Sequence, residues 1–105
     1  MQDAEFHSLV DELVMQLEDE LEDYPEDLDI ENSAGILTIG FPNGSTFVVS
    51  RQIANHEIWV AAKSGGFHLA YKQDDWICGT TKENLASLSS RVVTEQIGRE
   101  VSVLG

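Results

Sequence analysis

The chain has 105 residues, of which 42% are hydrophobic, and a formal net charge of −13 at pH 7. This is the size of one domain with its own apolar core, so the composition excludes a disordered chain, and no run of about 18 apolar residues is present that could span a membrane. Residues 1–31 contain 13 of the 19 Asp and Glu residues and no Lys or Arg. Because phosphates would be repelled there, the charge excludes nucleic-acid binding through this acidic third.

The N-terminus and the cysteine content indicate the compartment. Residues 1–10, MQDAEFHSLV, have neither the basic nor the apolar segment of a secretory signal peptide, which predicts a cytoplasmic protein. Cys78 is the only cysteine and has no partner for a disulfide or a zinc motif, in keeping with a reducing compartment. We expect its thiol to pack as a small apolar group rather than to act as a nucleophile.

In the first segment, apolar residues recur every three or four positions, which predicts an amphipathic helix that ends near Tyr24, ahead of Pro25. The predicted apolar stripe consists of Phe6, Leu9, Val10, Leu13, Leu17, Leu21 and Tyr24. Because each helical residue turns by about 100°, acidic side chains fall on two neighbouring strips that point away from this stripe. The first strip holds Asp11, Glu18 and Glu22, and the second holds Glu5, Glu12, Asp19 and Asp23.

Residues 18–31 read EDELEDYPEDLDIE, where nine of the fourteen side chains are carboxylates. Like charges three or four residues apart destabilise a helix by roughly 0.2–0.5 kcal/mol per pair, and carboxylates near its C-terminus also oppose the helix dipole. A cationic partner would remove this penalty. Oxygen ligands favour hard cations such as ferric iron, calcium and lanthanides, and they also accept ferrous and manganous ions. Since one convex face offers two or three carboxylates per ion, we expect weak, multiple sites that salt screens.

His7 lies one helical turn from Asp3 and from Asp11, so it could join a metal site on this surface, although an isolated surface histidine is the commoner arrangement. The sequence shows no buried carboxylate pair, no nucleophile motif and no positioned base. It therefore predicts a protein that is not an enzyme.

From Leu28 to Gly79 the hydrophobic period changes to two, which indicates strands. Asn43-Gly44 between two alternating runs is a strong hairpin signal, and residues 64–66, Ser-Gly-Gly, predict a second turn. Short turns between successive strands imply an antiparallel meander. The predicted strands are 36–40, 45–51, 57–62, 67–71 and 76–78.

A second helix follows the strands. Thr80 and Glu83 fit a capping box at its start, and Gly98 suits its C-terminal end. Its predicted apolar stripe consists of Leu85, Leu88, Val92, Val93 and Ile97. The order helix, strands, helix predicts the α+β class: a two-layer α/β sandwich in which the N- and C-terminal helices pack on one face of a single antiparallel sheet.

That arrangement leaves the other face of the sheet to solvent. In residues 57–62, Ile58 and Val60 share the register that suits the helix-covered face, so Trp59 is expected on the open face. Trp59 either packs on its cross-strand neighbours or anchors a partner, and the alternation does not choose between these two interpretations. Arg51 and Gln52, on the adjoining strand, would extend such a patch.

Several stretches are specific enough to compare with a known family: EFH (5–7) ahead of the acidic helix, GILTIGFPNGS (35–45) and SRQIANHEIWVAAKSGGFHLAYKQDDWIC (50–78). With the closing helix they resemble the frataxin family, in particular its short bacterial CyaY type, over nearly the whole chain. The resemblance implies an α/β sandwich that binds iron weakly through an acidic ridge on the first helix and first strand.

The resemblance also implies that the protein modulates iron–sulfur cluster assembly by binding the cysteine desulfurase and its scaffold protein. By position, the partner-binding sheet surface corresponds to Arg51, Gln52 and Trp59. The ridge corresponds to Asp11, Glu12, Glu18, Asp19, Glu22, Asp23, Asp27, Asp29 and Glu31.

The chain departs from the family motif at three positions: Ser50 stands for Asn, Ala54 for Pro and Glu57 for Gln. Two functions are compared. The first is an iron-responsive regulator or iron donor for cluster assembly, monomeric without metal. The second is an acidic interaction protein that mimics nucleic acid in a basic groove, with incidental metal binding. Only the first gives Trp59 a role.

Overall fold

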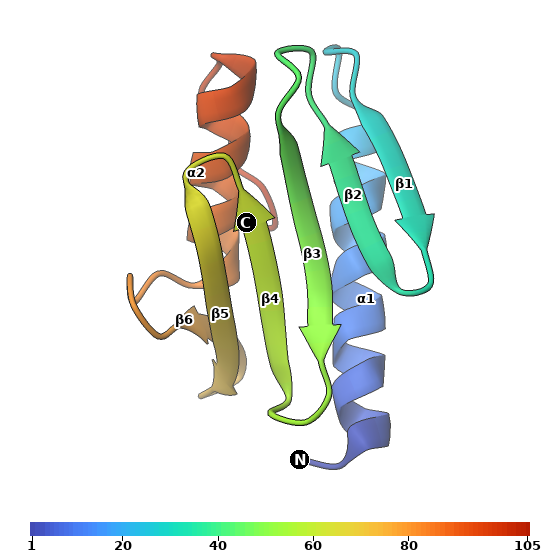
Figure 1. Ribbon diagram of the computed structural model, residues 1–105, viewed down its shortest axis with the longest axis vertical. Helices are drawn as coiled ribbons and strands as arrows, with labels where there is room; N and C mark the ends of the chain where they lie inside the picture. Colours follow the sequence, from blue (N-terminus) through green and yellow to red (C-terminus); the bar gives the residue numbers. More distant parts are fainter.

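The computed structural model describes residues 1–105 as two helices and one six-stranded sheet (Figure 1). The strands lie in sequence order, each antiparallel to the next, so the predicted meander and the α+β class are confirmed. The elements are α1 (Asp3–Glu22), β1 (Asp29–Ser33), β2 (Ile36–Gly40), β3 (Thr46–Gln52), β4 (Glu57–Ala62), β5 (Gly65–Lys72), β6 (Asp75–Cys78) and α2 (Leu85–Ile97). Neither helix combines the length and the apolarity needed to cross a membrane.

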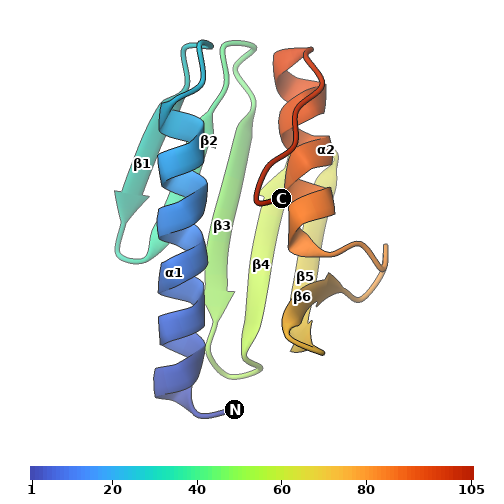
Figure 2. The same ribbon diagram turned by 180° about the vertical axis from the view of Figure 1, so that it is seen from behind.

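Both helices cover the same face of the sheet, as Figure 2 shows from behind. The core lies between these two layers and includes Ile58 and Val60, on the face predicted for them. The buried stripe of α1 consists of Phe6, Val10, Val14, Leu17 and Leu21. Leu9 and Leu13, which were also predicted in this stripe, are only partly buried against the core, and Val14, which was not predicted, is buried in it.

Two predicted boundaries are wrong. Asn84, not Thr80, caps α2: its side-chain oxygen accepts a hydrogen bond from the Ser87 backbone N–H at 2.8 Å. The turn between β4 and β5 is formed by residues 63–64, and Gly66 pairs with Ala61 inside the sheet. Gly98 ends α2 in the left-handed conformation, as predicted, with φ of 73°.

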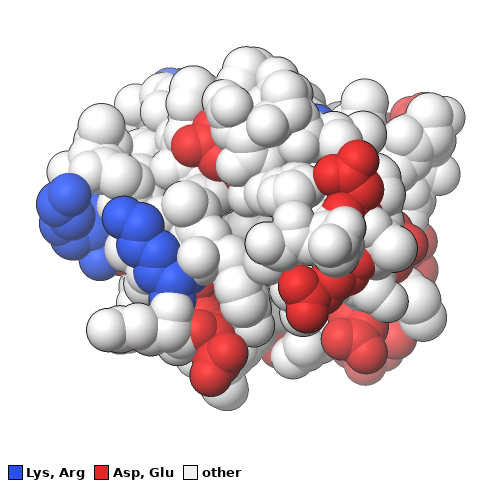
Figure 3. Space-filling view, turned by 90° about the horizontal axis from the view of Figure 1, so that it is seen from below, with Lys and Arg blue, Asp and Glu red and all other residues white.

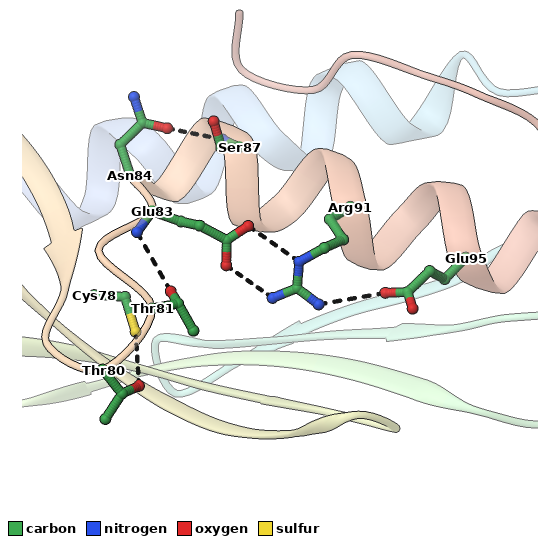
Figure 4. A network of polar contacts seen from close by, with 8 residues as sticks. All are labelled: Cys78, Thr80, Thr81, Glu83, Asn84, Ser87, Arg91 and Glu95. Atoms are coloured by element: carbon green, nitrogen blue, oxygen red, sulfur yellow. Dashed lines mark hydrogen bonds and ion pairs between the residues drawn. The ribbon is translucent and has the colours of Figure 1, made fainter.

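Polar contacts fix the loop before α2 to the helix itself (Figure 4). The Arg91 guanidinium donates to both carboxylate oxygens of Glu83, at 3.0 and 2.8 Å, and to Glu95 at 3.4 Å. Thr81 accepts a hydrogen bond from the Glu83 backbone N–H at 3.3 Å. The loop between β6 and α2 is therefore held by charge-assisted bonds as well as by packing.

The C-terminal tail runs back between α1 and α2 (Figure 2). Val103 is fully buried there, and its backbone N–H donates to the Ser90 hydroxyl at 2.8 Å. The Leu104 backbone N–H donates to the Glu20 carboxylate at 3.1 and 3.2 Å. Glu20 is thereby turned toward the tail and away from the acidic strips of α1.

Candidate functional site

Charge is segregated on the folded molecule (Figure 3): carboxylates gather on the side of α1 and β1, and basic side chains lie toward the opposite, β5–β6 side. All five ion pairs of the structure involve Arg51, His56, Arg91 or Arg99. Among the nine predicted ridge carboxylates, only Asp11 is in an ion pair. The ridge thus keeps its negative charge without internal compensation by Lys or Arg over most of its length.

The two acidic strips of α1 differ in their surroundings. The strip of Asp11, Glu18 and Glu22 runs beside the sheet, and the Glu18 carboxylate accepts a hydrogen bond from the Asn32 side chain of β1 at 3.1 Å. The other strip, Glu5, Glu12, Asp19 and Asp23, is exposed and accepts no side-chain hydrogen bond. These four carboxylates are the freest to exchange water for a cation.

The ridge residues of β1 do not face α1. Ile30 and Asn32 pair with Ile39 and Leu37, whose side chains lie under α1, so Asp29 and Glu31 point to the open face of the sheet. The edge of β1 therefore divides the predicted ridge between two faces. Asp27 lies in the loop before β1 and, with Asp29, lines a shallow depression at that end of the molecule.

No three His, Cys, Asp or Glu side chains converge on a point that could hold a metal ion. The oxygen donors suit hard cations, but an ion here would be held by one or two carboxylates and keep water in its other positions. The carboxylates therefore do not form a rigid, preformed metal centre.

The structure places His7 and Arg51 differently from the predictions, which put His7 in a metal site with Asp3 or Asp11 and put Arg51 on the same surface as Trp59. Arg51 pairs with Ile58 across the β3–β4 ladder, so its side chain faces α1 and lies on the opposite side of the sheet from Trp59. Its guanidinium donates to Asp11 at 2.9 Å and to Nδ1 of His7 at 3.0 Å. Because arginine has no acceptor, His7 must accept this bond, which occupies the lone pair of its Nδ1. Asp3, the other carboxylate considered for His7, pairs instead with His56 at 2.7 Å.

Trp59 lies on the open face of the sheet, as predicted. Its ring stacks on His68 of β5, with centroids 4.4 Å apart and planes 6° apart, and its indole N–H donates to the Glu57 carboxylate at 3.2 Å. The residue remains 37% exposed, so cross-strand packing and an accessible aromatic surface coexist. Gln52 shares this face, and its side-chain oxygen accepts a bond from the Ala54 backbone N–H.

The sequence analysis did not identify two residues that belong to this surface. His68 is the cross-strand partner of Trp59, and Ile36 of β2 is 43% exposed on the same face. The register of the β4–β5 hairpin would have paired His68 with Trp59, had the turn been placed at residues 63–64. Together, Trp59, His68, Gln52 and Ile36 form a surface beside the Glu57 carboxylate, which we term the open-face patch.

Cys78 is fully buried, as the packing prediction requires. Burial raises the pKa of its thiol, but hydrogen bonds from the side chains and backbone of Thr80 and Thr81 outweigh burial and lower the pKa to about 7. Since the sulfur is closed off from solvent, this thiol adds no reactive group to the site.

Comparison with known proteins assigns the family. The family model described as the frataxin-like domain matches residues 1–99. The chain belongs to the frataxin family. Its relatives place it with the bacterial CyaY type: it is 46% identical over 101 residues to the iron-sulfur cluster assembly protein CyaY of Azotobacter vinelandii, covering 94% of this chain and 92% of that one. The corresponding CyaY protein of Pseudomonas fluorescens is 42% identical over 107 residues, covering 100% and 97%.

Solved frataxin structures share the fold. Frataxin from Psychromonas ingrahamii superposes with a TM-score of 0.87 at 28% identity, covering 96% of both chains. A trimeric yeast frataxin from Saccharomyces cerevisiae, described as complexed with ferrous iron, has a TM-score of 0.72 at 26% identity, covering 94% of this chain and 88% of that one. The frataxin architecture, two helices on a six-stranded antiparallel sheet, is therefore confirmed.

Proposed function

We propose that this frataxin-family chain binds iron weakly through the acidic surface of α1 and β1 and acts in the cytoplasm in iron–sulfur cluster assembly. It would do so as a regulator or iron donor, without catalysing a reaction itself. The observation that carries the proposal is the ridge itself: eight of its nine predicted carboxylates have no basic partner within the chain, since Asp11 alone is paired. The names of the CyaY relatives and the ferrous complex of the yeast neighbour support the pathway and the metal.

Iron is cargo in this proposal. A ferrous or ferric ion held by one or two exposed carboxylates exchanges its ligands with water readily, so the surface can give up iron as easily as it takes it. Other hard di- or trivalent cations would occupy the same positions. Arg51 withholds Asp11 and His7 from the ion, which leaves Glu12, Glu18, Asp19, Glu22 and Asp23 as the principal ligands on α1.

The partners we propose are the cysteine desulfurase and the scaffold protein of cluster assembly. The acidic face of α1 would attract basic surfaces on the desulfurase, and such charge complementarity raises the rate of encounter. The open-face patch, centred on Trp59, would supply the aromatic anchor of the interface. Because iron and a basic partner draw on the same carboxylates, each should change the affinity for the other by the same factor.

Two measurements test the proposal. The first is an anaerobic titration with ferrous iron followed by NMR residue by residue, in which we expect the resonances of Glu12, Glu18 and Asp19 to broaden first. Perturbation confined to β5, β6 or α2 would refute the metal assignment.

The second is capture of purified cysteine desulfurase at low salt by three forms of the protein: the unchanged chain, Trp59→Arg and the matched control Ile53→Arg. Ile53 is 44% exposed in the β3–β4 turn, outside the open-face patch, so both variants add one positive charge at an exposed apolar residue. Loss of capture only with Trp59→Arg supports the proposal. Equal capture by all three forms would favour the acidic mimic of nucleic acid, which needs no aromatic anchor.

A further inference from the structure

The β2–β3 turn holds the only Asn-Gly pair of the chain, Asn43-Gly44. The Phe41 backbone N–H donates to the carbonyl of Ser45, and the Gly44 backbone N–H donates to the carbonyl of Phe41, both at 2.9 Å. Gly44 has φ of 86°, as in hairpin loops that end in a glycine bulge. The turn lies at the same end of the molecule as the C-terminal end of α2 (Figure 1, Figure 2).

The Asn43 side chain joins this turn to α2. Its Nδ2 group donates to Oε1 of Gln96 at 2.9 Å, across 53 residues of sequence. Its Oδ1 accepts a hydrogen bond from the Ser45 backbone N–H at 3.0 Å. The Ser45 hydroxyl lies 2.7 Å from Oδ1 of Asn43 and 2.6 Å from Oε1 of Gln96, and its single proton can go to only one of the two. The side-chain amide of Asn43 is therefore held at both its oxygen and its nitrogen.

An asparagine followed by glycine is the pair in which a peptide backbone most readily attacks the preceding side chain. The backbone nitrogen of the second residue closes a cyclic imide on the side-chain carbonyl carbon of the first, and glycine, which has no side chain, hinders this attack least. In this fold the Gly44 N–H is bonded to Phe41, and the Asn43 amide is bonded to Gln96 and Ser45. Both reacting groups must therefore be released before they can combine.

We propose that Asn43 is a deamidation site, and that opening of its contact with Gln96 of α2 sets the rate. The Gly44 nitrogen gives its proton to solvent and attacks Cγ of Asn43. The new N–Cγ bond closes a succinimide as the Cγ–Nδ2 bond breaks, and the departing NH2 group takes up a proton and leaves as ammonia. Water then adds to one of the imide carbonyls and opens the ring, which leaves aspartate or isoaspartate in place of Asn43. The net reaction consumes water and releases ammonia, and no oxidant or reductant takes part.

Either product would release the hairpin from α2. A carboxylate has no N–H to donate to Gln96, so two oxygens would face each other in place of the hydrogen bond. Isoaspartate also lengthens the backbone within the turn, which disturbs the hydrogen bonds that close it. The new charge adjoins the depression lined by Asp27 and Asp29, of which the neighbouring Gly44 is a part. Deamidation would thus loosen one end of the sheet from the helix layer and extend the acidic surface.

The experiment measures deamidation at each asparagine by peptide mass spectrometry during incubation at neutral pH, well below the Tm. The samples are the folded chain, the chain unfolded in guanidinium chloride and the folded variant Gln96→Ala. We expect Asn43 to react about tenfold or more slowly in the folded chain than in the unfolded chain, since several hydrogen bonds must open first. Gln96→Ala should speed the reaction in the folded protein about two- to tenfold, the effect of losing one hydrogen bond.

Two controls separate the Gln96 contact from a general loss of stability. Gln16→Ala makes the same substitution in α1, where the glutamine is exposed and forms no side-chain hydrogen bond, and it should leave the rate at Asn43 unchanged. Asn55, in the exposed β3–β4 turn, reports unfolding of the whole chain within the same sample.

A faster reaction at Asn43 alone in Gln96→Ala supports the inference, provided that the folded chain reacts more slowly than the unfolded one. Equal rates in the folded and unfolded chain would show that the fold does not protect the site, and would refute it. A rate that Gln96→Ala leaves unchanged, or no conversion in that variant while the unfolded chain reacts fully, would refute it as well. A rise shared by Asn55 would trace the effect to global unfolding and overturn the role of Gln96.

Discussion

Asp23→Lys tests whether charge crowding on α1 destabilises the fold. Asp23 ends the helix with φ of −86° and ψ of −1°, is exposed, and accepts no side-chain hydrogen bond. Lysine can adopt this conformation without strain, so the substitution changes charge and little else. It replaces repulsion from Asp19 and Glu20, one turn earlier, by attraction, and it puts a cation at the negative end of the helix dipole.

The expected gain follows from these contacts. Each reversed pair changes the free energy of unfolding by up to twice the usual 0.2–0.5 kcal/mol, roughly, and the dipole adds about 0.3–1 kcal/mol. Glu20 contributes less than Asp19, because its carboxylate is turned toward the Leu104 backbone N–H. We therefore expect about 1–2 kcal/mol at low ionic strength, and a rise in Tm of about 5–10 °C in a domain of this size.

The assay is thermal unfolding followed by circular dichroism at low salt and in about 1 M salt, where the screening length falls to about 3 Å. The gain should largely disappear at high salt. Glu100→Lys is the control, since it makes the same change of charge at an exposed position outside α1. A fall in Tm for Asp23→Lys, a gain that survives high salt, or an equal gain in the control would refute the account of crowding.

Two further predictions concern the arginines. Arg51→Leu should lower the free energy of unfolding by about 0.5–1.5 kcal/mol, because a mostly buried guanidinium loses its bonds to His7 and to the exposed Asp11. A ferrous titration of the variant should now broaden His7 and Asp11. Unchanged urea unfolding would show that the Arg51–Asp11 pair contributes nothing. The bond from Arg91 holds the pKa of Glu83 below its ordinary value of 4.5. Its stabilising effect is therefore complete above pH 4.5 and is lost as the pH falls through the lowered pKa. Glu83→Gln should reduce the loss of stability between neutral and acidic pH, and an unaltered difference would contradict this.

Both helices, the five strands from β2 to β6 and the faces of the sheet followed from hydrophobic periodicity, whereas β1, which is mostly exposed and acidic, was not predicted as a strand. The Asn43-Gly44 turn and the alternation through Ile58, Trp59 and Val60 depend only on neighbouring residues, and the structure has both as predicted. The glycines at 65 and 66 misled the placement of the second turn. Glycine marks positions where the backbone can adopt unusual conformations, but it does not fix which residues form the turn. Here residues 63–64 form the turn, and Gly66 pairs with Ala61 in the β4–β5 ladder.

Arg51 shows where local reasoning about the site ends. Alternation from Phe47 through Val49 puts Arg51 on the helix-covered face, although a charged side chain is expected in solvent. What makes the buried position tolerable is Asp11 together with His7, forty and forty-four residues earlier, and no local pattern contains that information. The split of the β1 carboxylates from those of α1 likewise depends on the β1–β2 register.

The internal pairing of arginines determines where the free charge lies. Arg51 neutralises the N-terminal part of the acidic surface, while Arg91 and Arg99 make bidentate bonds to Glu83 and Glu26. The three lysines form no ion pair. None of the ion pairs involves a carboxylate in the C-terminal half of α1, so no Lys or Arg of the chain pairs with the negative charge there. A positively charged partner would therefore be attracted to this part of α1.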